Sequence, residues 1–471
     1  MASNDLRGFL KNLEENGELM RITKEVDWNL ELSHIAKVNE EKNGPALLFE
    51  NVKDYKNPVF VSALSSLKRL AISMNMPVDT TMTQMAREWV DRTKELMPPI
   101  YVESGPIKEN IDKGEDVNLF KFPVPKFYEM DGGRYIGTFV CVLTKDPENG
   151  WVNIGTYRMQ ILDEKTCGIY LIKGKHGDLH RQKYAKLNKP MQVAAVIGYD
   201  PLMFLASSTL IGAGDDEYDY IGALRGAPVE VVKGEFVDLP IPANAEMVIE
   251  GELWPEALRE EGPFGEYTGY YSGKGTTPRH FINVKAVTYR NDMVFHATTV
   301  GRPVTDTHMI MAMNHTATLW ADLEAMKIPG IQSVYIPPES SGRFMAIVSV
   351  KQLYPGHSSM VGNAVIASTT GSYGLKVVVV VDDDIAADDM GRVIWAMSTR
   401  MAPERGCQII SRGRSTPLDP SLQIGNRDIT SRIIMDCCIP YEWKEKPIPI
   451  TLSDSVLEMV KQKWLDYGFK E

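Results

Sequence analysis

Residues 135–162 read YIGTFVCVLTKDPENGWVNIGTYRMQIL, and this stretch decides the fold. Its two outer runs, 135–143 and 152–162, are rich in β-branched and aromatic residues, and a segment with Pro147 and Gly150 lies between them. Such runs, bounded by turn-forming residues, are typical of strands. The stretch therefore predicts two strands at the start of a long β-rich region.

The β-rich pattern continues as far as residue 289. Short runs with strand character recur there, separated by segments that contain Gly and Pro. The further candidate strands are 168–172, 192–197, 229–233, 247–253 and 280–289. So many short strands favour a sandwich or a barrel.

Segments of mixed character flank the β-rich region. The first hundred residues combine helical periodicity with short extended runs, which predicts a small α/β unit. After Thr307, the spacing of Met309, Met313, Ala317 and Trp320 predicts a helix that links two domains. The pattern then alternates between strand and helix, which predicts a second α/β domain with a largely buried central strand. Its predicted elements are 344–350, 360–368, 375–381 and 388–399.

The end of the chain, 453–467, predicts an amphipathic helix. Val456, Val460 and Trp464 share one face, and Ser455 with Glu458 forms a candidate capping box. We expect this helix to dock on a neighbour, either in this chain or in a partner subunit.

Length, charge and cysteine content limit the classes of protein. A chain of 471 residues predicts two or three domains. The net charge of −11 disfavours binding to nucleic acid or to an anionic membrane, because either needs a basic face. The five cysteines have no CxxC spacing, so we expect reduced core thiols. No run is long enough to cross a bilayer, and the N-terminus lacks the pattern of a signal peptide, so we expect a soluble, cytoplasmic protein.

The stretch 261–266, EGPFGE, places two carboxylates on a tight loop, because its Gly and Pro residues exclude a regular helix. A Glu that pairs with an Arg stays ionised, whereas burial raises the pKa of a second Glu and lets it carry a proton at neutral pH. The alternative is a solvated turn with two ordinary surface acids.

Asn153 and Arg158 lie on the predicted strand 152–162. Their separation of five positions places them on opposite faces of a regular strand, but a bulge at Gly155 would bring both to one site. The alternative is an edge strand with an exposed Arg.

His176, His180 and Glu217 are scattered and lack the spacing of a zinc site, so a structural role is the alternative. If they bind metal, an Asn oxygen, an imidazole and a carboxylate make a mostly hard set. Such a set suits Mg²⁺ or Mn²⁺ completed by phosphate oxygens.

Taken together, these stretches resemble the UbiD-like decarboxylases, the family that includes ferulate, hydroxybenzoate and furan dicarboxylate decarboxylases. The similarity covers nearly the whole chain. It is carried by residues 153–158, 206–208, 217–223, 228–233, 246–252, 261–266 and 394–400.

The resemblance implies an α+β fold in five parts. These are an N-terminal α/β domain (1–110), a flavin-reductase-like split β-barrel that binds the cofactor (111–305), a linking helix (306–335), a C-terminal α/β oligomerisation domain (336–440), and an arm with a terminal helix (441–471). It also implies a homodimer or a hexamer built as a trimer of dimers.

The resemblance further implies that prenylated FMN is the cofactor. A divalent ion, Mn²⁺ or Mg²⁺, would join its phosphate to Asn153, His176 and Glu217. A K⁺ or Na⁺ ion would use oxygens of Ala206, Ser207 and Thr209, with Glu217 shared. Arg158, Glu261 and Glu266 would be the catalytic residues beside the modified ring. The other expected cofactor contacts are Ile154, Thr156, Tyr157, Ser208 and Arg392.

The implied function is the reversible, non-oxidative decarboxylation of an aromatic or heteroaromatic acid, with a flavin prenyltransferase supplying the cofactor. The expected substrates are hydroxybenzoates and furan or pyrrole carboxylates, including furan dicarboxylate, and CO₂ or bicarbonate is the co-product. Arg158 would hold the carboxylate and Glu266 would protonate the ring carbon. His308, Met311 and Asn314 would shape the substrate site, with helix packing as the alternative. Two rival functions are a non-catalytic flavin-binding or scaffold protein of the same fold and a flavin-independent metal hydrolase.

Overall fold

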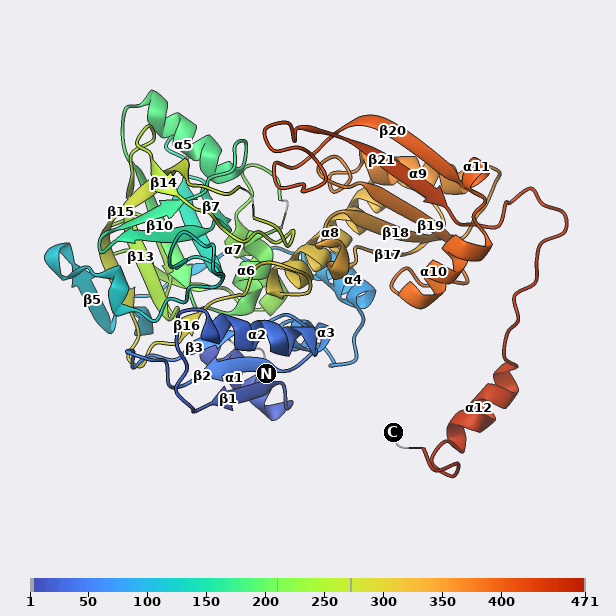
Figure 1. Cartoon of the computed structure of the whole chain (residues 1–471), viewed down its shortest axis with the longest axis horizontal. Helices are drawn as coiled ribbons and strands as arrows, with labels where there is room; N and C mark the ends of the chain where they lie inside the picture. Colours follow the sequence, from blue (N-terminus) through green and yellow to red (C-terminus); the bar gives the residue numbers. More distant parts are fainter. Residues whose placement is uncertain (1–3, 210, 272, 470–471) are drawn as a thin grey trace.

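The computed structural model describes residues 4–209, 211–271 and 273–469. It confirms the predicted α+β class. Figure 1 shows an N-terminal α/β unit, a β-rich central body and a C-terminal sheet with helices. The long helix α8 (Asp306–Ala325) lies between the central body and the C-terminal sheet.

The N-terminal unit packs helices against a four-stranded sheet of order β1-β2-β3-β16. Helix α1 (Leu6–Glu15) buries its apolar stripe of Leu6, Phe9, Leu10 and Leu13. The last strand, β16 (Phe295–His296), comes from far along the chain, so the unit is tied to the end of the central body. The other elements are β1 (Leu19–Ile22), α2 (Glu31–Glu41), β2 (Ala46–Phe49), β3 (Val59–Val61), α3 (Leu67–Ser73) and α4 (Met82–Arg92).

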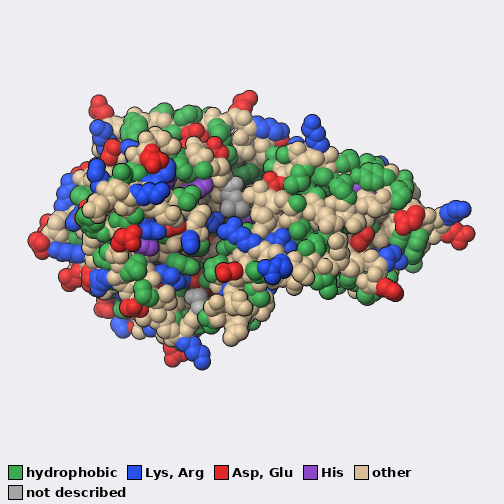
Figure 2. Space-filling view, turned by 90° about the horizontal axis from the view of Figure 1, so that it is seen from above, with side chains coloured by type: hydrophobic (Ala, Val, Ile, Leu, Met, Phe, Trp, Pro, Cys, Tyr) green, Lys and Arg blue, Asp and Glu red, His purple; other side chains and the backbone are tan. Residues whose placement is uncertain are grey.

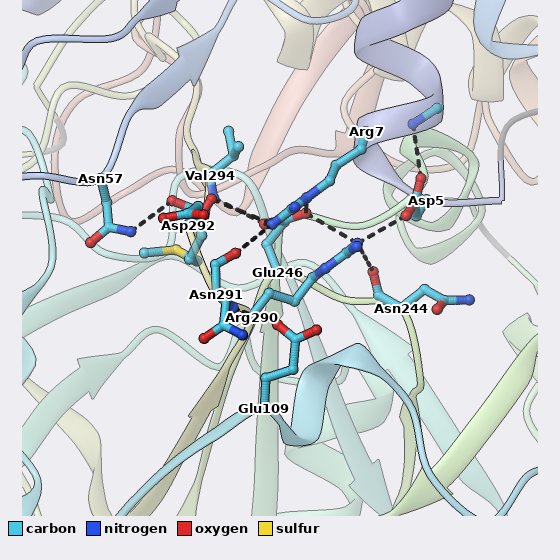
Figure 3. A network of polar contacts seen from close by, with 12 residues as sticks. Asp5, Arg7, Asn57, Glu109, Asn244, Glu246, Arg290, Asn291, Asp292 and Val294 are labelled. Atoms are coloured by element: carbon cyan, nitrogen blue, oxygen red, sulfur yellow. Dashed lines mark hydrogen bonds and ion pairs between the residues drawn. The ribbon is translucent and has the colours of Figure 1, made fainter.

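A network of ion pairs around one buried carboxylate fixes α1 to the central body (Figure 3). Glu246 accepts hydrogen bonds from Arg7 Nε (2.9 Å), from Arg7 Nη2 (3.1 Å) and from the Val294 N–H (3.0 Å). Arg290 lies 3.3 Å from the same carboxylate and also pairs with Asp5 at 2.9 Å. The start of the chain is therefore held by Glu246 and by residues just before β16.

The two strands at the ends of the central sheet are consecutive in the sequence, and for this reason the sheet curls. Its path is β7-β6-β10-β13-β15-β9-β8, with β5 and β14 added on β15. The end strands β7 (Val152–Gly155) and β8 (Met159–Asp163) are joined only by Thr156, Tyr157 and Arg158. Such a linker spans at most about 15 Å. The sheet must therefore bend until its ends lie close together, which produces the predicted split barrel with a seam at residues 156–158.

Five of the other seven strands of the central sheet overlap predicted runs, and the last of them is longer than predicted, whereas the strands 110–113 and 259–261 were not predicted. The seven strands are β5 (Asn110–Lys113), β6 (Val140–Lys145), β9 (Thr166–Ile169), β10 (Met191–Ile197), β13 (Met247–Leu253), β14 (Arg259–Glu261) and β15 (Thr277–Tyr289). The helices of this body are α5 (His176–Lys186), α6 (Pro201–Ser207) and α7 (Glu217–Arg225).

One strand prediction is wrong, and another is confirmed but lies outside the central sheet. The run 152–162 is not one strand with a bulge, because the chain leaves the sheet after Gly155. The ring of Tyr157 folds back so closely that a Cβ atom on Gly155 would lie 2.6 Å from it. The run 229–233 forms β11 (Glu230–Lys233), which lies outside the central sheet and pairs with β4 (Ile100–Tyr101) and β12 (Pro240–Pro242).

The C-terminal domain is a five-stranded sheet of order β17-β18-β19-β21-β20. Its middle strand β19 (Val377–Asp382) is largely buried, as predicted. The linking helix was predicted to reach residue 335, but α8 ends at Ala325 and residues 331–335 form a strand of this sheet. The remaining elements are β17 (Ile331–Tyr335), β18 (Met345–Val350), α9 (His357–Ala367), α10 (Met390–Thr399), α11 (Pro403–Gly406), β20 (Cys407–Arg414) and β21 (Ile429–Asp436).

The C-terminal arm runs away from the rest of the chain (Figure 1). Its helix α12 (Asp454–Gln462) has no buried residue, and Ile448 and Ile450 are almost fully exposed. Docking on this chain is therefore excluded for α12, and docking on a partner subunit stays a prediction. The predicted capping box is wrong, because Ser453 precedes the helix and Ser455 lies inside it.

None of the described helices is both long enough and apolar enough to span a membrane. All five cysteines are free, as predicted, and only Cys407 is not buried.

Candidate active site

Arg158 lies in the barrel seam and joins two acids from one loop. Its Nε donates to Oε1 of Glu261 (3.0 Å), its Nη2 donates to Oε2 of Glu261 (2.8 Å), and its Nη1 contacts Oε1 of Glu266. Both carboxylates are buried. The guanidinium also lies over the rings of Tyr170 (4.8 Å) and Phe264 (5.1 Å). The structure thus brings the three residues predicted to be catalytic into one group, and excludes the alternative of a solvated turn.

Two polar side chains hold the backbone of the loop between these acids. The Gly262 N–H donates to Gln160 Oε1 (2.8 Å), and the Gly265 N–H donates to Asp131 Oδ1 (3.0 Å). Burial raises the pKa of Asp131 to about 6, although its backbone hydrogen bonds oppose the shift. These contacts leave the loop little freedom to move its acids.

Contacts from Tyr135 and Gly132 hold the same loop from another side chain and from the backbone. The Tyr135 O–H lies 3.0 Å from Glu261 Oε1 and 3.1 Å from the Pro263 carbonyl oxygen, so it can donate to either. The Gly132 N–H also donates to that carbonyl (2.8 Å), and a Cβ atom on Gly132 would lie only 1.9 Å from the Gly262 carbonyl oxygen. The close approach requires a glycine at position 132.

Burial makes Glu266 a weaker acid than an exposed glutamate. Burial raises the pKa of Glu266 above its ordinary value against the charge of Arg158, and the charge of Glu261 raises it further. Burial would lower the pKa of Arg158, but Glu266 and Glu261 outweigh it and hold that pKa above its ordinary value. The group therefore combines a permanent cation with an acid that holds its proton more tightly than usual.

Glu217 is another buried acid, at the first position of α7. Its Oε2 accepts a hydrogen bond from the Ile154 N–H (2.8 Å), and within the described residues it forms no ion pair. Burial raises the pKa of Glu217 to about 8. A buried carboxylate without a cationic partner is a group that a metal ion would satisfy.

Two aromatic residues gather the other predicted metal ligands around the same strand. Tyr157 accepts from the Gly177 N–H (3.0 Å) and shares a hydrogen bond with the buried Asn153. The ring of Trp151 lies 4.8 Å from the ring of His176, the first residue of α5. Asn153, His176 and Glu217 thus lie on segments tied to β7. The described part of the chain contains no group of three His, Cys, Asp or Glu residues that could hold a metal ion. The predicted set would not count as such a group, because its third member is an asparagine.

The residues predicted for a monovalent ion lie at the end of α6. Ala206 and Ser207 are its last two residues, and the Ser207 hydroxyl lies 3.3 Å from Cys141 Sγ. Burial raises the pKa of Cys141 to about 12, and the charge of Glu217 acts in the same direction. The end of α6 therefore lies near Glu217. Ser208 and Thr209 follow, and their hydroxyls donate to carbonyls of α6.

Arg392 is not brought to this site. It lies on α10, its side chain is largely exposed, and its only ion pair within the described residues is with Asp389 at 3.4 Å. Thr156 lies in the seam between β7 and β8 and is partly buried.

Two of the residues predicted for the substrate site are engaged in packing contacts. Both ring nitrogens of His308 have partners: the Thr305 N–H donates to Nδ1 (3.0 Å), and Nε2 lies 2.5 Å from the Tyr267 carbonyl. Asn314 Nδ2 donates to the Leu205 carbonyl (2.9 Å), while its Oδ1 is buried and has no hydrogen-bond partner among the described residues. Met311 is partly buried. The contacts of His308 favour the packing alternative.

Comparison with known proteins identifies the family. Residues 10–89, 100–303 and 308–437 match the N-terminal, Rift-related and C-terminal domains of 3-octaprenyl-4-hydroxybenzoate carboxy-lyase, UbiD. The chain belongs to the UbiD family. This UbiD-family chain is 36% identical over 444 residues to an uncharacterized protein of Archaeoglobus fulgidus, with 90% of each chain covered.

Solved structures of UbiD-class enzymes have the same fold. HmfF from Pelotomaculum thermopropionicum in complex with FMN is 31% identical, with a TM-score of 0.89, and the match covers 98% of this chain and 100% of HmfF. The closed form of vanillic acid decarboxylase from Sedimentibacter hydroxybenzoicus is 30% identical, with a TM-score of 0.86 and 99% of each chain covered. This UbiD-family protein is therefore an enzyme of the carboxy-lyase class.

No sequence motif identifies the residues that hold the loop. Only their contacts with residues 261–265 distinguish Asp131, Gly132, Tyr135 and Gln160. In the sequence, Tyr135 and Gln160 are simply members of predicted strands.

Proposed function

We propose that this enzyme catalyses the reversible, non-oxidative decarboxylation of an aromatic or heteroaromatic acid, with prenylated FMN as cofactor and Glu266 as proton donor. One observation carries the proposal. A single guanidinium, Arg158, is shared by two buried carboxylates, and one of them, Glu266, has a raised pKa.

The residues around Glu217 fit the phosphate end of such a cofactor. A buried acid without a cation, an imidazole and an amide are suitable ligands for Mn²⁺ or Mg²⁺, and the hydroxyls after α6 suit K⁺ or Na⁺. HmfF has been solved with FMN and, in an evolved dimeric form, with prenylated FMN. We infer that Asn153, His176 and Glu217 hold the divalent ion and that a flavin prenyltransferase supplies the cofactor.

The chain's own groups then have separate tasks. Prenylated FMN, when bound, supplies an acceptor for the electrons that CO₂ leaves behind. Arg158 orients the carboxylate that will be lost, and the rings of Phe264 and Tyr170 keep water from its guanidinium. Glu266 delivers its proton to the ring carbon, and Glu261 holds Arg158 in place through two hydrogen bonds.

The test uses protein produced together with a flavin prenyltransferase. A panel of hydroxybenzoates and furan or pyrrole carboxylates is assayed for CO₂ release, and high bicarbonate should drive the reverse carboxylation. Glu266→Gln keeps an oxygen for Arg158 but has no proton to transfer, so turnover should fall at least about a hundredfold. Flavin content, measured by absorbance, should not change.

Glu260→Gln is the matched control, because Glu260 is exposed and lies one residue before Glu261. It should behave like the unmodified protein. Full turnover by Glu266→Gln would remove Glu266 from the role of proton donor. Absence of CO₂ from every acid, with the flavin bound, would reject the proposed function and favour a flavin-binding protein without turnover.

We infer that a second copy of this chain covers the C-terminal arm, in a homodimer or a trimer of dimers. The arm exposes Ile448, Ile450 and Leu452 together with the apolar residues of α12. Contiguous apolar surface of this kind is typical of interfaces between subunits.

A further inference from the structure

Arg158 is one cation between two buried carboxylates. Figure 2 shows Asp and Glu side chains on one face of the molecule, interspersed with Lys and Arg side chains, where water stabilises their charge. Glu261 and Glu266 have no such access to water, since they are only 2% and 6% exposed. If both were ionised, one negative charge would remain buried without a cation, which is costly. One of the two acids therefore holds a proton.

The two carboxylates differ in the number of donors that contact them. Glu261 accepts from Arg158 Nε (3.0 Å) and from the Tyr135 O–H (3.0 Å) at Oε1, and from Arg158 Nη2 (2.8 Å) at Oε2. Among the described residues, the carboxylate of Glu266 is contacted by one donor, Arg158 Nη1. Hydrogen bonds to a carboxylate favour its ionised form. These contacts therefore favour an ionised Glu261 and a proton on Glu266.

The hydroxyl of Tyr135 has one proton and three acceptors within reach. They are Glu261 Oε1 (3.0 Å), the Pro263 carbonyl oxygen (3.1 Å) and Gln160 Oε1 (3.4 Å). Each of these acceptors also has another donor, so the strength of the new bond decides between them. A hydrogen bond to an ionised acceptor is the stronger one. Tyr135 therefore donates to Glu261.

The ring of Tyr135 is fixed beside Glu261. It is fully buried, and its centre lies 4.3 Å from the ring centre of Phe264, over which Arg158 also lies. The backbone before Tyr135 is tied to β8, because the N–H of residue 161 donates to the carbonyl of residue 134 (2.9 Å). Since β8 follows Arg158 directly, the same strand positions the hydroxyl and the guanidinium.

The other charged and titratable groups around the two acids do not contact either carboxylate. In the described part of the chain, no hydrogen bond or ion pair joins either acid to Asp131, Tyr170, Tyr267 or Arg279. Arg279 lies over the ring of Tyr170 (4.0 Å), and Arg158 lies over the same ring (4.8 Å). Burial raises the pKa of Glu266 in spite of the charges of Arg158 and Arg279. Tyr135 is therefore the neutral donor that distinguishes the two acids.

We propose that Tyr135 is a positioning residue of this reaction, which keeps Glu261 ionised through a hydrogen bond and so leaves the transferable proton on Glu266. The inference rests on the proposed function, in which Glu266 protonates the ring carbon. In that step the O–H bond of Glu266 breaks, and a C–H bond forms with the electrons that CO₂ leaves behind. Glu261 stays ionised before and after the transfer. Without the Tyr135 hydroxyl, the two acids would compete for one proton.

Nuclear magnetic resonance tests this without turnover. Protein loaded with FMN carries carbon-13 at the carboxyl carbon of glutamate, and Glu261→Gln and Glu266→Gln assign the two resonances. At neutral pH, the Glu266 resonance should lie at the position of a protonated carboxyl group and that of Glu261 at the position of a carboxylate. Tyr135→Phe should shift the Glu261 resonance towards the protonated position. It should also lower kcat about tenfold with KM changed less than twofold, because a hydrogen bond to a charged group is lost.

Tyr199→Phe is the matched control. Tyr199 is also buried, and its hydroxyl lies 3.0 Å from Nη2 of Arg225, which pairs with Asp200 at 2.8 Å. This variant loses a hydroxyl beside a different Arg–carboxylate pair, so both glutamate resonances and kcat should stay unchanged. A protonated Glu261 in the unmodified protein would overturn the inference. So would a Glu261 resonance that does not move in folded Tyr135→Phe.

A second measurement keeps both the ring and the hydroxyl, in case Tyr135→Phe does not fold. With 3-fluorotyrosine at position 135, the fluorine resonance should move in Glu261→Gln and stay in place in Glu260→Gln, which changes an exposed neighbour. A resonance that is indifferent to Glu261→Gln would reject the hydrogen bond on which the inference depends. CO₂ release by the unmodified protein, measured separately, decides the proposed function whichever result is obtained.

Discussion

Gly132→Ala should slow catalysis strongly, although Gly132 has no side chain that could take part in the reaction. The new Cβ atom would lie 1.9 Å from the Gly262 carbonyl oxygen and 2.5 Å from its carbon, and both are backbone atoms of the catalytic loop. An ordinary contact needs about 3.4 Å, so the loop or the turn at Gly132 must shift by more than about 1 Å. A displacement of about 1 Å at a reacting group costs about a hundredfold in rate, or about 2.7 kcal/mol of activation free energy.

The neighbouring glycine provides the control. A Cβ atom on Gly133 would lie 3.0 Å from Nε2 of Gln160 and 3.9 Å from the Ile161 carbonyl oxygen, so a shift of a few tenths of an ångström is enough, and Oε1 of Gln160 can keep its hydrogen bond to Gly262. The assay is the rate of CO₂ release per bound flavin, with the most active acid of the panel. Gly132→Ala should lose about two orders of magnitude in kcat, whereas Gly133→Ala should stay within a few-fold of the unmodified enzyme.

Thermal unfolding and flavin content show whether each variant is folded. If Gly132→Ala keeps more than a third of the original kcat with a normal flavin content, the loop does not need the close approach at Gly132. If the two alanine variants lose activity equally, the loss does not come from the contact with Gly262.

Three further predictions concern stability, assembly and the metal ion. Burial raises the pKa of Glu40 to about 7, so its ionisation destabilises the fold increasingly between its unfolded pKa and pH 7, by about 3 kcal/mol in total. In the unmodified protein, the unfolding free energy measured by urea titration should therefore fall between pH 5 and pH 8, and Glu40→Gln should make this fall smaller. An equal fall in both proteins would show that Glu40 does not cause it. Removal of residues 441–471 should reduce the mass of the assembly in light scattering and leave FMN binding intact; equal masses would show that the arm does not join subunits. Chelation of divalent ions should weaken FMN binding at least about tenfold, with recovery on addition of Mn²⁺, and Glu217→Gln should have the same effect. FMN affinity that is indifferent to both treatments would exclude a metal role for Glu217.

Regular elements could be predicted where one physical signal dominates. The stripe of α1 and the run of β13 follow directly from periodicity, because each element buries one consistent set of side chains. The end of β7 at Gly155 could not be predicted, since strand-like residues continue through the seam and the return of the Tyr157 ring depends on Gly177, far along the sequence.

The same distinction holds for the candidate site. The resemblance to a family was sufficient to propose Arg158, Glu261 and Glu266, and the structure adds their mutual contacts. Asp131 carries no signal in the sequence, because an isolated polar residue shows its partners only in space. His308 illustrates the opposite case. A histidine near a substrate site suggests recognition, yet both of its ring nitrogens are already bonded within the protein.

The seam at residues 156–158 joins the two end strands of the barrel and carries Arg158, whose acid partners Glu261 and Glu266 come from the end of β14 and the loop after it. The three side chains meet only when the central sheet has curled far enough to bring its two ends together. In this fold, formation of the candidate catalytic group and closure of the barrel are therefore a single event.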